Sequence, residues 1–439
     1  MRFKIISLGC PKNLVDSERI AGLLAAQGHE LSDDGELTIV NTCAFITEAT
    51  RESIDTILSE AGRKRDCGGR LVVTGCLYER YGDELKTLLP EVDLFLSNVG
   101  GEAEALLGLD KMSGSAESEG CVTTTTLVPA QSVGRKVLTR PPSAYLKIQE
   151  GCNNHCTYCT IPLIKGPLVS RPVPEIRDEF QSLLSSGFKE ITMVGQDITS
   201  FGKDSGTDLK VLLAALLSGK EEFFLRLLYL HPQGIDDELL DLIASDDRII
   251  KYMDIPLQHS EDRILKAMNR GYTRAQAENL LERIRDRMPD AVLRTTMIVG
   301  FPGETDGEFE ALCSFVRSAQ FDNLGAFVYS REDATPAHKL KGQVRKPVKQ
   351  ERHSRLMQIQ QDISKERLKR LVGRKMQVVV EGPEGEGMIG RLLVQAPDVD
   401  GLAFIQGNCE AGQIREGEVV KTLDYDVIVR VGGTDGTDQ

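Results

Sequence analysis

Three strand-like apolar runs in the first 80 residues each end in a cysteine. These cysteines, Cys10, Cys43 and Cys76, are spaced 33 residues apart. Stretches with the spacing of amphipathic helices separate the runs. Alternating strands and helices predict a parallel sheet with helices on its faces, and the carboxyl ends of parallel strands share one edge, where ligands bind. The pattern therefore predicts an α/β domain in which three distant thiols converge.

The elements of this first region can be placed from their residue patterns. The expected strands are Phe3–Leu8, Leu37–Val40, Arg70–Thr74 and Asp93–Leu96, and the expected helices are Asp16–Ala26 and Thr47–Ala61.

Two interpretations of the three spaced cysteines compete. Cysteine is a small residue that is often buried in a core. Thiolates are also the usual ligands of iron–sulfur clusters. One cysteine at a strand end would favour the core interpretation, but three at equivalent positions favour a shared cluster. Three ligands for a cluster of four irons leave one iron open to a small ligand.

A second cysteine set is compressed into eight residues. Cys152, Cys156 and Cys159 follow the strand-like run 145–150 with C-x3-C-x2-C spacing. Such a loop can wrap a compact iron–sulfur cluster. A structural zinc site would need a fourth protein ligand, and His155 inside the loop is poorly placed to supply it. The spacing favours a cluster with one open iron, which indicates catalysis more than electron storage.

The bulk composition limits the classes of function. The 439 residues are 41% hydrophobic and 27% charged, with a net charge of −13, which offers no general electrostatic reason to bind nucleic acid. The sequence shows neither a membrane-spanning run nor a signal peptide. We therefore expect a cytoplasmic protein with no membrane partner, in which cysteines are metal ligands or reactive thiols rather than disulfides.

The rest of the chain divides into regions with different residue patterns. Residues 113–137 are rich in Ser, Thr, Gly and Pro and predict a linker. Six strand candidates then alternate with helices, which predicts an open, partial barrel. They are Tyr145–Gln149, Ile191–Val194, Phe224–Tyr229, Tyr252–Ile255, Arg294–Val299 and Leu324–Tyr329. Cys313 lies in an apolar helix of this region, and we expect it in the core.

The C-terminal part predicts one long helix and a small barrel. Val348–Val372 is charged and amphipathic, and we expect its basic residues to form a solvated face. From Gly373 onward, short strands separated by Gly and Pro predict an all-β barrel. This last segment contains 6 Lys and Arg against 12 Asp and Glu, a net charge of −6.

At these residues the chain resembles the radical S-adenosylmethionine (SAM) superfamily. C-x3-C-x2-C after the first barrel strand, with Tyr158 before the last cysteine, is its signature. The upstream set of Cys10, Cys43 and Cys76 narrows the resemblance to the methylthiotransferases. The resemblance spans essentially the whole chain and implies four segments, namely an N-terminal cluster domain (1–112), the linker (113–137), a radical-SAM core (138–369) and a C-terminal TRAM barrel (372–438).

Two substrate classes compete within that family. One branch modifies an adenosine of tRNA, and the other, RimO, modifies an aspartate of ribosomal protein S12. The chain resembles the RimO branch at Pro11-Lys-Asn-Leu-Val15 and at Ala396–Gly401. An acidic C-terminal barrel is poorly suited to bind phosphates and suits a basic ribosomal protein. We therefore expect methylthiolation of the aspartate β-carbon, with the tRNA reaction as the alternative.

The resemblance also implies cofactors and roles. Cys152, Cys156 and Cys159 would hold a [4Fe–4S] cluster whose open iron binds SAM, the source of the radical. Cys10, Cys43 and Cys76 would hold an auxiliary [4Fe–4S] cluster that delivers the sulfur, and a second SAM would donate the methyl group.

Contacts to SAM and the protein partners are expected as well. The expected SAM contacts are Tyr158, Gly195, Gln196, Gln258 and Gly300. The glycines are equally consistent with turns. The expected partners are S12, free or in the 30S subunit, and an electron donor such as flavodoxin or ferredoxin, with no nucleic-acid substrate.

Overall fold

The computed structural model describes residues 1–97, 134–385 and 387–432. Within these ranges the chain forms two compact units. The N-terminal unit comprises residues up to 138 together with 151–153 and 159–167, and the second unit comprises the rest. Most of the expected linker and the predicted boundaries at 112 and 438 lie outside the described residues.

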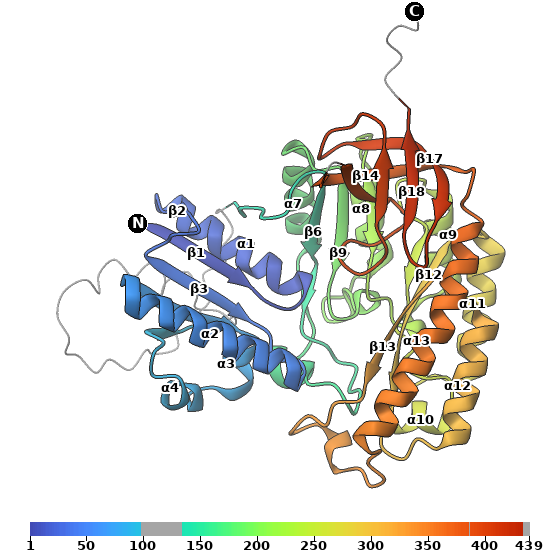
Figure 1. Cartoon of the computed structure of the whole chain (residues 1–439), viewed down its shortest axis with the longest axis horizontal. Coiled ribbons are helices and arrows are strands. Elements are labelled where there is room, and N and C mark those ends of the chain that lie inside the picture. The colour runs from blue at the N-terminus through green and yellow to red at the C-terminus, as the bar shows by residue number, and fades with distance from the viewer. Residues whose placement is uncertain (98–133, 386, 433–439) are drawn as a thin grey trace, which may run out of the picture. The chain divides into compact units, whose positions relative to one another are not determined.

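The N-terminal unit is built on a five-stranded parallel sheet with the order β2-β1-β3-β4-β5 (Figure 1). The strands are β1 (Arg2–Ser7), β2 (Glu30–Leu31), β3 (Leu37–Thr42), β4 (Arg70–Gly75) and β5 (Leu94–Phe95). The helices are α1 (Pro11–Ala26), α2 (Thr47–Cys67), α3 (Cys76–Tyr81), α4 (Glu84–Leu88) and α6 (Ile161–Lys165). The parallel α/β architecture predicted from the alternating pattern is confirmed.

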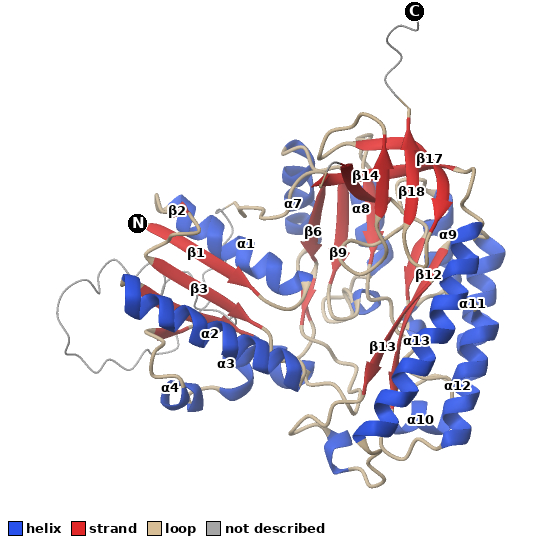
Figure 2. Ribbon diagram, viewed as in Figure 1, coloured by secondary structure: helices blue, strands red, loops and turns tan. Residues whose placement is uncertain are grey.

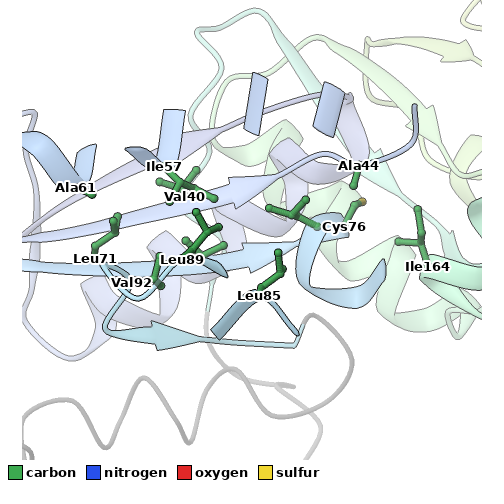
Figure 3. Close-up of a cluster of buried hydrophobic side chains, with 12 residues drawn as sticks. Val40, Ala44, Ile57, Ala61, Leu71, Cys76, Leu85, Leu89, Val92 and Ile164 are labelled. Carbon is green, nitrogen blue, oxygen red and sulfur yellow. The ribbon is translucent and has the colours of Figure 1, made fainter. Parts of the chain in front are cut away.

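Both faces of this sheet are covered by apolar side chains. Neighbouring residues of one strand point to opposite faces. Val40 of β3 packs with Ile57 of α2 and Leu85 of α4 (Figure 3). The preceding residue, Ile39, packs with Ile20 of α1 on the other face. The sheet is therefore buried between helices, as a parallel sheet requires.

The second unit contains six parallel strands in two three-stranded sheets, with the orders β10-β9-β6 and β11-β12-β13. A parallel bridge between Leu225 and Ile249 joins the two sheets, which completes the predicted open barrel. The strands are β6 (Ser143–Lys147), β9 (Glu190–Val194), β10 (Phe224–Leu227), β11 (Tyr252–Asp254), β12 (Val292–Val299) and β13 (Asn323–Val328).

Helices follow the strands of this open barrel. They are α7 (Val173–Ser185), α8 (Leu209–Leu217), α9 (Asp237–Ser245), α10 (Asp262–Ala267), α11 (Arg274–Arg287) and α12 (Asp306–Ala319). After the first strand, β7 (Gln149–Glu150) pairs antiparallel with β8 (Val169–Ser170), and the residues between them include the cysteine triplet and α6. Cys313 on α12 is fully buried, which confirms its expected place in the core.

A closed five-stranded barrel with the order β14-β15-β16-β18-β17 ends the chain (Figure 2). The strands are β14 (Lys375–Glu384), β15 (Gly387–Leu392), β16 (Ala403–Gln406), β17 (Ile414–Thr422) and β18 (Val427–Val431). Its interior is mostly valine, including Val378, Val380, Val419, Val427 and Val429. The predicted small all-β barrel is confirmed.

Two basic residues of the long helix α13 (Lys346–Lys369) depart from the expected solvated face, whereas others on it, such as Arg355 and Lys365, are exposed. Lys349 and Arg352 are buried rather than solvated. Lys349 donates to the carbonyl of Tyr329 at 2.8 Å, and Arg352 donates to Glu304 at 2.8 Å. The sequence pattern could not show this because the carboxylate partner lies about 50 residues upstream. No helix in the described part of the chain is long and apolar enough to cross a membrane.

Candidate functional site

The three spaced cysteines lie at the carboxyl edge of the N-terminal sheet. Cys10 follows β1 and is the N-cap of α1, Cys43 directly follows β3, and Cys76 directly follows β4 as the first residue of α3. Cys43 and Cys76 are buried, and Cys10 is half-buried. Because β1, β3 and β4 are adjacent and parallel, the three thiols share one end of the sheet.

Asn13 links the backbone segments that carry these cysteines. Its Nδ2 donates to the carbonyl oxygens of Leu8 (3.1 Å) and Thr42 (2.8 Å), and its Oδ1 accepts from the Cys76 thiol at 3.7 Å. Asn41 Nδ2 donates to the Asn13 carbonyl at 2.8 Å. One buried amide therefore contacts the end of β1, the end of β3 and the thiol after β4.

The thiols fit a metal cluster by their chemistry and surroundings. Burial raises the pKa of the Cys43 thiol, a backbone hydrogen bond from Phe45 lowers it in part, and the nearby Cys10 raises it again. A cluster iron would reverse this, because a coordinated thiol is held deprotonated. Ser53 fixes the Cys43 backbone through hydrogen bonds of 3.0 Å to its N–H and 2.7 Å to its carbonyl.

Gly9 allows Cys43 to approach. Its φ is +88°, and a Cβ there would lie 2.6 Å from Cys43 Cβ and 2.7 Å from Cys43 Sγ. We predict that Gly9→Ala displaces Cys43 and lowers the iron bound by reconstituted protein by about one four-iron cluster. Gly28→Ala is the matched control, since Gly28 has φ +82° and nothing within 4 Å. Equal iron content in the two variants would show that Gly9 does not shape a cluster site.

The compressed cysteine triplet lies in the loop after β7. The loop contributes residues to both units, with Cys152 and Cys159 in the N-terminal unit and Cys156 in the second. The Cys152 N–H donates to the Gly166 carbonyl at 3.2 Å. Gly151 has φ +71°, and a Cβ there would lie 1.9 Å from the Pro167 carbonyl oxygen, so only glycine fits.

Among the described residues, no group of three or more His, Cys, Asp or Glu side chains is arranged to hold a single metal ion. A four-iron cluster makes a different demand, because each cysteine binds a different iron. Its sulfurs are therefore held further apart than around one ion. Each cysteine set supplies three soft thiols, which match iron–sulfur ligation rather than a hard cation.

Four of the five residues expected to contact SAM lie at the carboxyl ends of the barrel strands. Gly195 and Gln196 follow β9, Gln258 lies beyond β11 and bridges to Met297 of β12, and Gly300 follows β12. Gln258 has φ +72°, which is unusual for a residue with a side chain. Strained backbone of this kind is typical of ligand sites.

Packing contacts fix the positions of Gly195 and Tyr158. A Cβ on Gly195 would lie 2.8 Å from Gln149 Cγ, so the glycine permits close approach of β9 to the start of the loop. Tyr158 is partly buried against Ile264, Met268 and Phe301. The carboxyl ends of barrel strands are where ligands bind in barrels of this kind.

Comparison with known proteins relates this geometry to named families. Family models match residues 2–97 (uncharacterized protein family UPF0004), 146–316 (radical SAM superfamily) and 372–431 (TRAM domain). A protein of Geobacter sulfurreducens named ribosomal protein uS12 methylthiotransferase RimO is 43% identical over 97% of this chain and 98% of its own length. The proteins of that name from Thermotoga maritima (42% identical, covering 97% of this chain and 99% of the relative) and Pelobacter propionicus (44%, covering 97% of each) match equally fully.

The chain belongs to the RimO family. The resemblance drawn from the two cysteine sets and from Pro11–Val15 is thereby confirmed. Among solved structures, the radical SAM methyltransferase TsrM of Kitasatospora setae aligns with a TM-score of 0.58 and 16% identity, covering 76% of each chain. The cobalamin-dependent radical SAM enzyme OxsB aligns with a TM-score of 0.51 and 13% identity, covering 83% of this chain and 56% of the other. At these identities the two likenesses support the fold of this RimO family member.

The sequence places His259, Gly303 and Glu304 at the ends of the barrel strands of this RimO family site, and the structure adds two features to that prediction. Glu304 Oε2 accepts hydrogen bonds from the N–H groups of Gly300 (2.7 Å) and Phe301 (3.2 Å) and thereby shapes the turn after β12. Burial raises the pKa of Glu304, although Arg352 opposes this, and burial lowers the pKa of the neighbouring His259 to about 3. His259 is therefore neutral at physiological pH. The second feature is Arg270, which contacts the cysteine loop.

Proposed function

We propose that this chain transfers a methylthio group to the β-carbon of an aspartate in ribosomal protein uS12. The observation that carries the proposal is near-complete alignment, at about 43% identity, with a protein named ribosomal protein uS12 methylthiotransferase RimO. The cytoplasm is the compartment that the ribosomal substrate implies. The electron donor we propose is flavodoxin or ferredoxin.

The two cysteine sets would form two cofactor sites with different roles. Cys152, Cys156 and Cys159 would hold the cluster that binds SAM. Cys10, Cys43 and Cys76 would hold the auxiliary cluster. When bound, the two clusters and SAM supply the electron, the 5′-deoxyadenosyl radical, the sulfur and the methyl group. The aspartate β-carbon needs radical chemistry because its C–H bond is only weakly acidic beside an ionised carboxylate.

The other residues would orient SAM and exclude water. Gly195, Gln196, Gln258 and Gly300 present backbone and amide groups at the carboxyl ends of the strands, where the amino and carboxylate groups of SAM need partners. Glu304 holds the Gly300 turn through two backbone hydrogen bonds. Neutral His259 adds no charge at this edge of the barrel. An imidazole with the ordinary pKa of histidine would instead change its charge near physiological pH.

The charge of the C-terminal barrel supports a protein substrate over tRNA. The segment from Gly373 to the C-terminus, which contains this barrel, has a net charge of −6 and would repel phosphates and attract a basic protein. We expect reduced, reconstituted enzyme and SAM to add a methylthio group to uS12 or to 30S subunits and not to tRNA, as measured by mass spectrometry. A product on tRNA alone would refute the substrate assignment, and reduced protein that makes no 5′-deoxyadenosine would refute the enzyme class.

A further inference from the structure

The turn after α10 holds the middle of the cysteine loop. Thr157 donates twice to this turn, from its N–H to the Met268 carbonyl at 3.0 Å and from its Oγ1 to the Ala267 carbonyl at 2.8 Å. Asn269 Nδ2 donates to the His155 carbonyl at 2.8 Å. These three bonds fix the backbone on both sides of Cys156.

The next residue, Arg270, contacts the sulfur atom of Cys156. Its Nη1 donates to Cys156 Sγ at 3.4 Å, and its Nη2 donates to the Pro256 carbonyl at 2.7 Å. The guanidinium lies over the Tyr272 ring, 5.6 Å from the ring centroid. Asn269 has φ +57°, a left-handed conformation that asparagine tolerates, and this conformation turns the chain toward the loop.

The Arg270 guanidinium is a buried cation that needs an anion. The residue is 6% exposed, and no carboxylate in the described part of the chain forms an ion pair with it. Its Nε is buried without a hydrogen-bond partner among those residues. A buried charge is costly unless an opposite charge lies close by. Two acids lie against Arg270: the Cys156 thiol, which would become an anion on binding iron, and the Tyr272 hydroxyl, which donates to the Leu257 carbonyl.

We infer that Arg270 is a positioning residue that fixes Cys156 Sγ and raises the reduction potential of the cluster bound there. The inference rests on the proposed function, in which Cys156 is a cluster ligand. One-electron reduction adds a negative charge to the cluster, and a buried cation stabilises the more negative state. Hydrogen bonds to ligand sulfurs and local net charge are the main protein influences on such potentials. Arg270 contributes both.

The test is a redox titration of the full-length, reconstituted enzyme with dithionite, followed by electron paramagnetic resonance. The cluster concerned is recognised by the signal that changes when SAM is added. Arg270→Met should lower the equilibrium constant for one-electron reduction at least tenfold, a shift of about 59 mV to more negative potential. Arg270→Lys keeps the charge and should recover most of the shift.

Arg287→Met is the matched control, because Arg287 on α11 pairs with Asp241 at the surface. It should leave the potential unchanged. An Arg270→Met enzyme with full iron content and the wild-type potential would overturn the inference. If Arg270→Met loses iron while its circular dichroism stays native, the iron content of Arg270→Lys is the deciding measurement. Restored iron supports the inference, and loss in both variants overturns it.

A separate measurement distinguishes failure of the underlying proposal. Cys156→Ala should lower bound iron by about one cluster, from about eight to about four irons. If it keeps all its iron, Cys156 is not a ligand, and the proposed cofactor assignment fails. If it loses the cluster while Arg270→Met retains the wild-type potential, only the role of Arg270 fails.

Discussion

Joint replacement of Cys10, Cys43 and Cys76 by alanine is expected to abolish methylthio transfer and to spare reductive cleavage of SAM. The three thiols share the carboxyl edge of the N-terminal sheet around Asn13, whereas the residues proposed to bind SAM lie at the strand ends of the second unit. The variant should bind about four irons instead of about eight. It should still release 5′-deoxyadenosine, measured by chromatography, while mass spectrometry of uS12 shows no methylthio group.

The control for this variant removes a thiol that is not a proposed ligand. Cys409 belongs to the C-terminal barrel, where it packs beside the valine core. Cys409→Ala should retain both activities and the full iron content. If the triple variant is folded, keeps its second cluster and yet makes no 5′-deoxyadenosine, the separation of roles between the two cysteine sets is wrong.

Much of the fold could be predicted because the main signals are local. Buried parallel strands are short apolar runs, and all six predicted barrel strands occur within two residues of the expected ends, allowing for the continuation of β6 into β7. The order of alternation then constrains the topology, because parallel neighbours need helical crossovers. The shared edge for Cys10, Cys43 and Cys76 follows from that topology alone.

Other features depend on contacts between distant residues. Helix α1 begins at Pro11, five residues before the expected start, because proline suits the first helical turn. Strand β2, of only two residues, is formed by pairing with β1 rather than by its own pattern. Buried Arg352 and Arg270 could not be distinguished from surface arginines, since their partners lie about 50 and 110 residues away in the sequence.

A buried ion-pair network joins the open barrel to the C-terminal barrel within the second unit. Glu190, the first residue of β9, is fully buried. Its Oε1 accepts from Arg226 Nη2 at 2.8 Å and from Arg391 Nη1 at 3.1 Å, and its Oε2 accepts from Ser143 Oγ at 2.6 Å. Arg226 also donates to the carbonyl of Leu393. One carboxylate thus pairs with a guanidinium from each barrel, and Glu381 pairs with Arg391 as a second carboxylate.

Glu190→Gln is expected to destabilise the second unit by about 3 to 5 kcal/mol, the typical cost of breaking a buried ion pair. The substitution keeps the shape of the side chain and leaves Arg226 and Arg391 buried without their common anion. Denaturant unfolding followed by circular dichroism measures the loss. Glu278→Gln is the control, because Glu278 pairs with Arg274 at the surface and such pairs contribute at most about 1 kcal/mol.

The same network predicts how stability depends on pH. Burial would raise the pKa of Glu190, but Arg391 and Arg226 hold it down at about 2, below the ordinary value of 4.5. A lowered folded-state pKa contributes stability that is fully present above the ordinary value and is lost as pH falls from about 4.5 through about 2. The difference corresponds to about 3 kcal/mol. Wild-type stability should therefore fall across this acid range, and Glu190→Gln should lack that part of the fall. Parallel acid profiles for the two proteins would show that Glu190 is not held ionised between the two barrels.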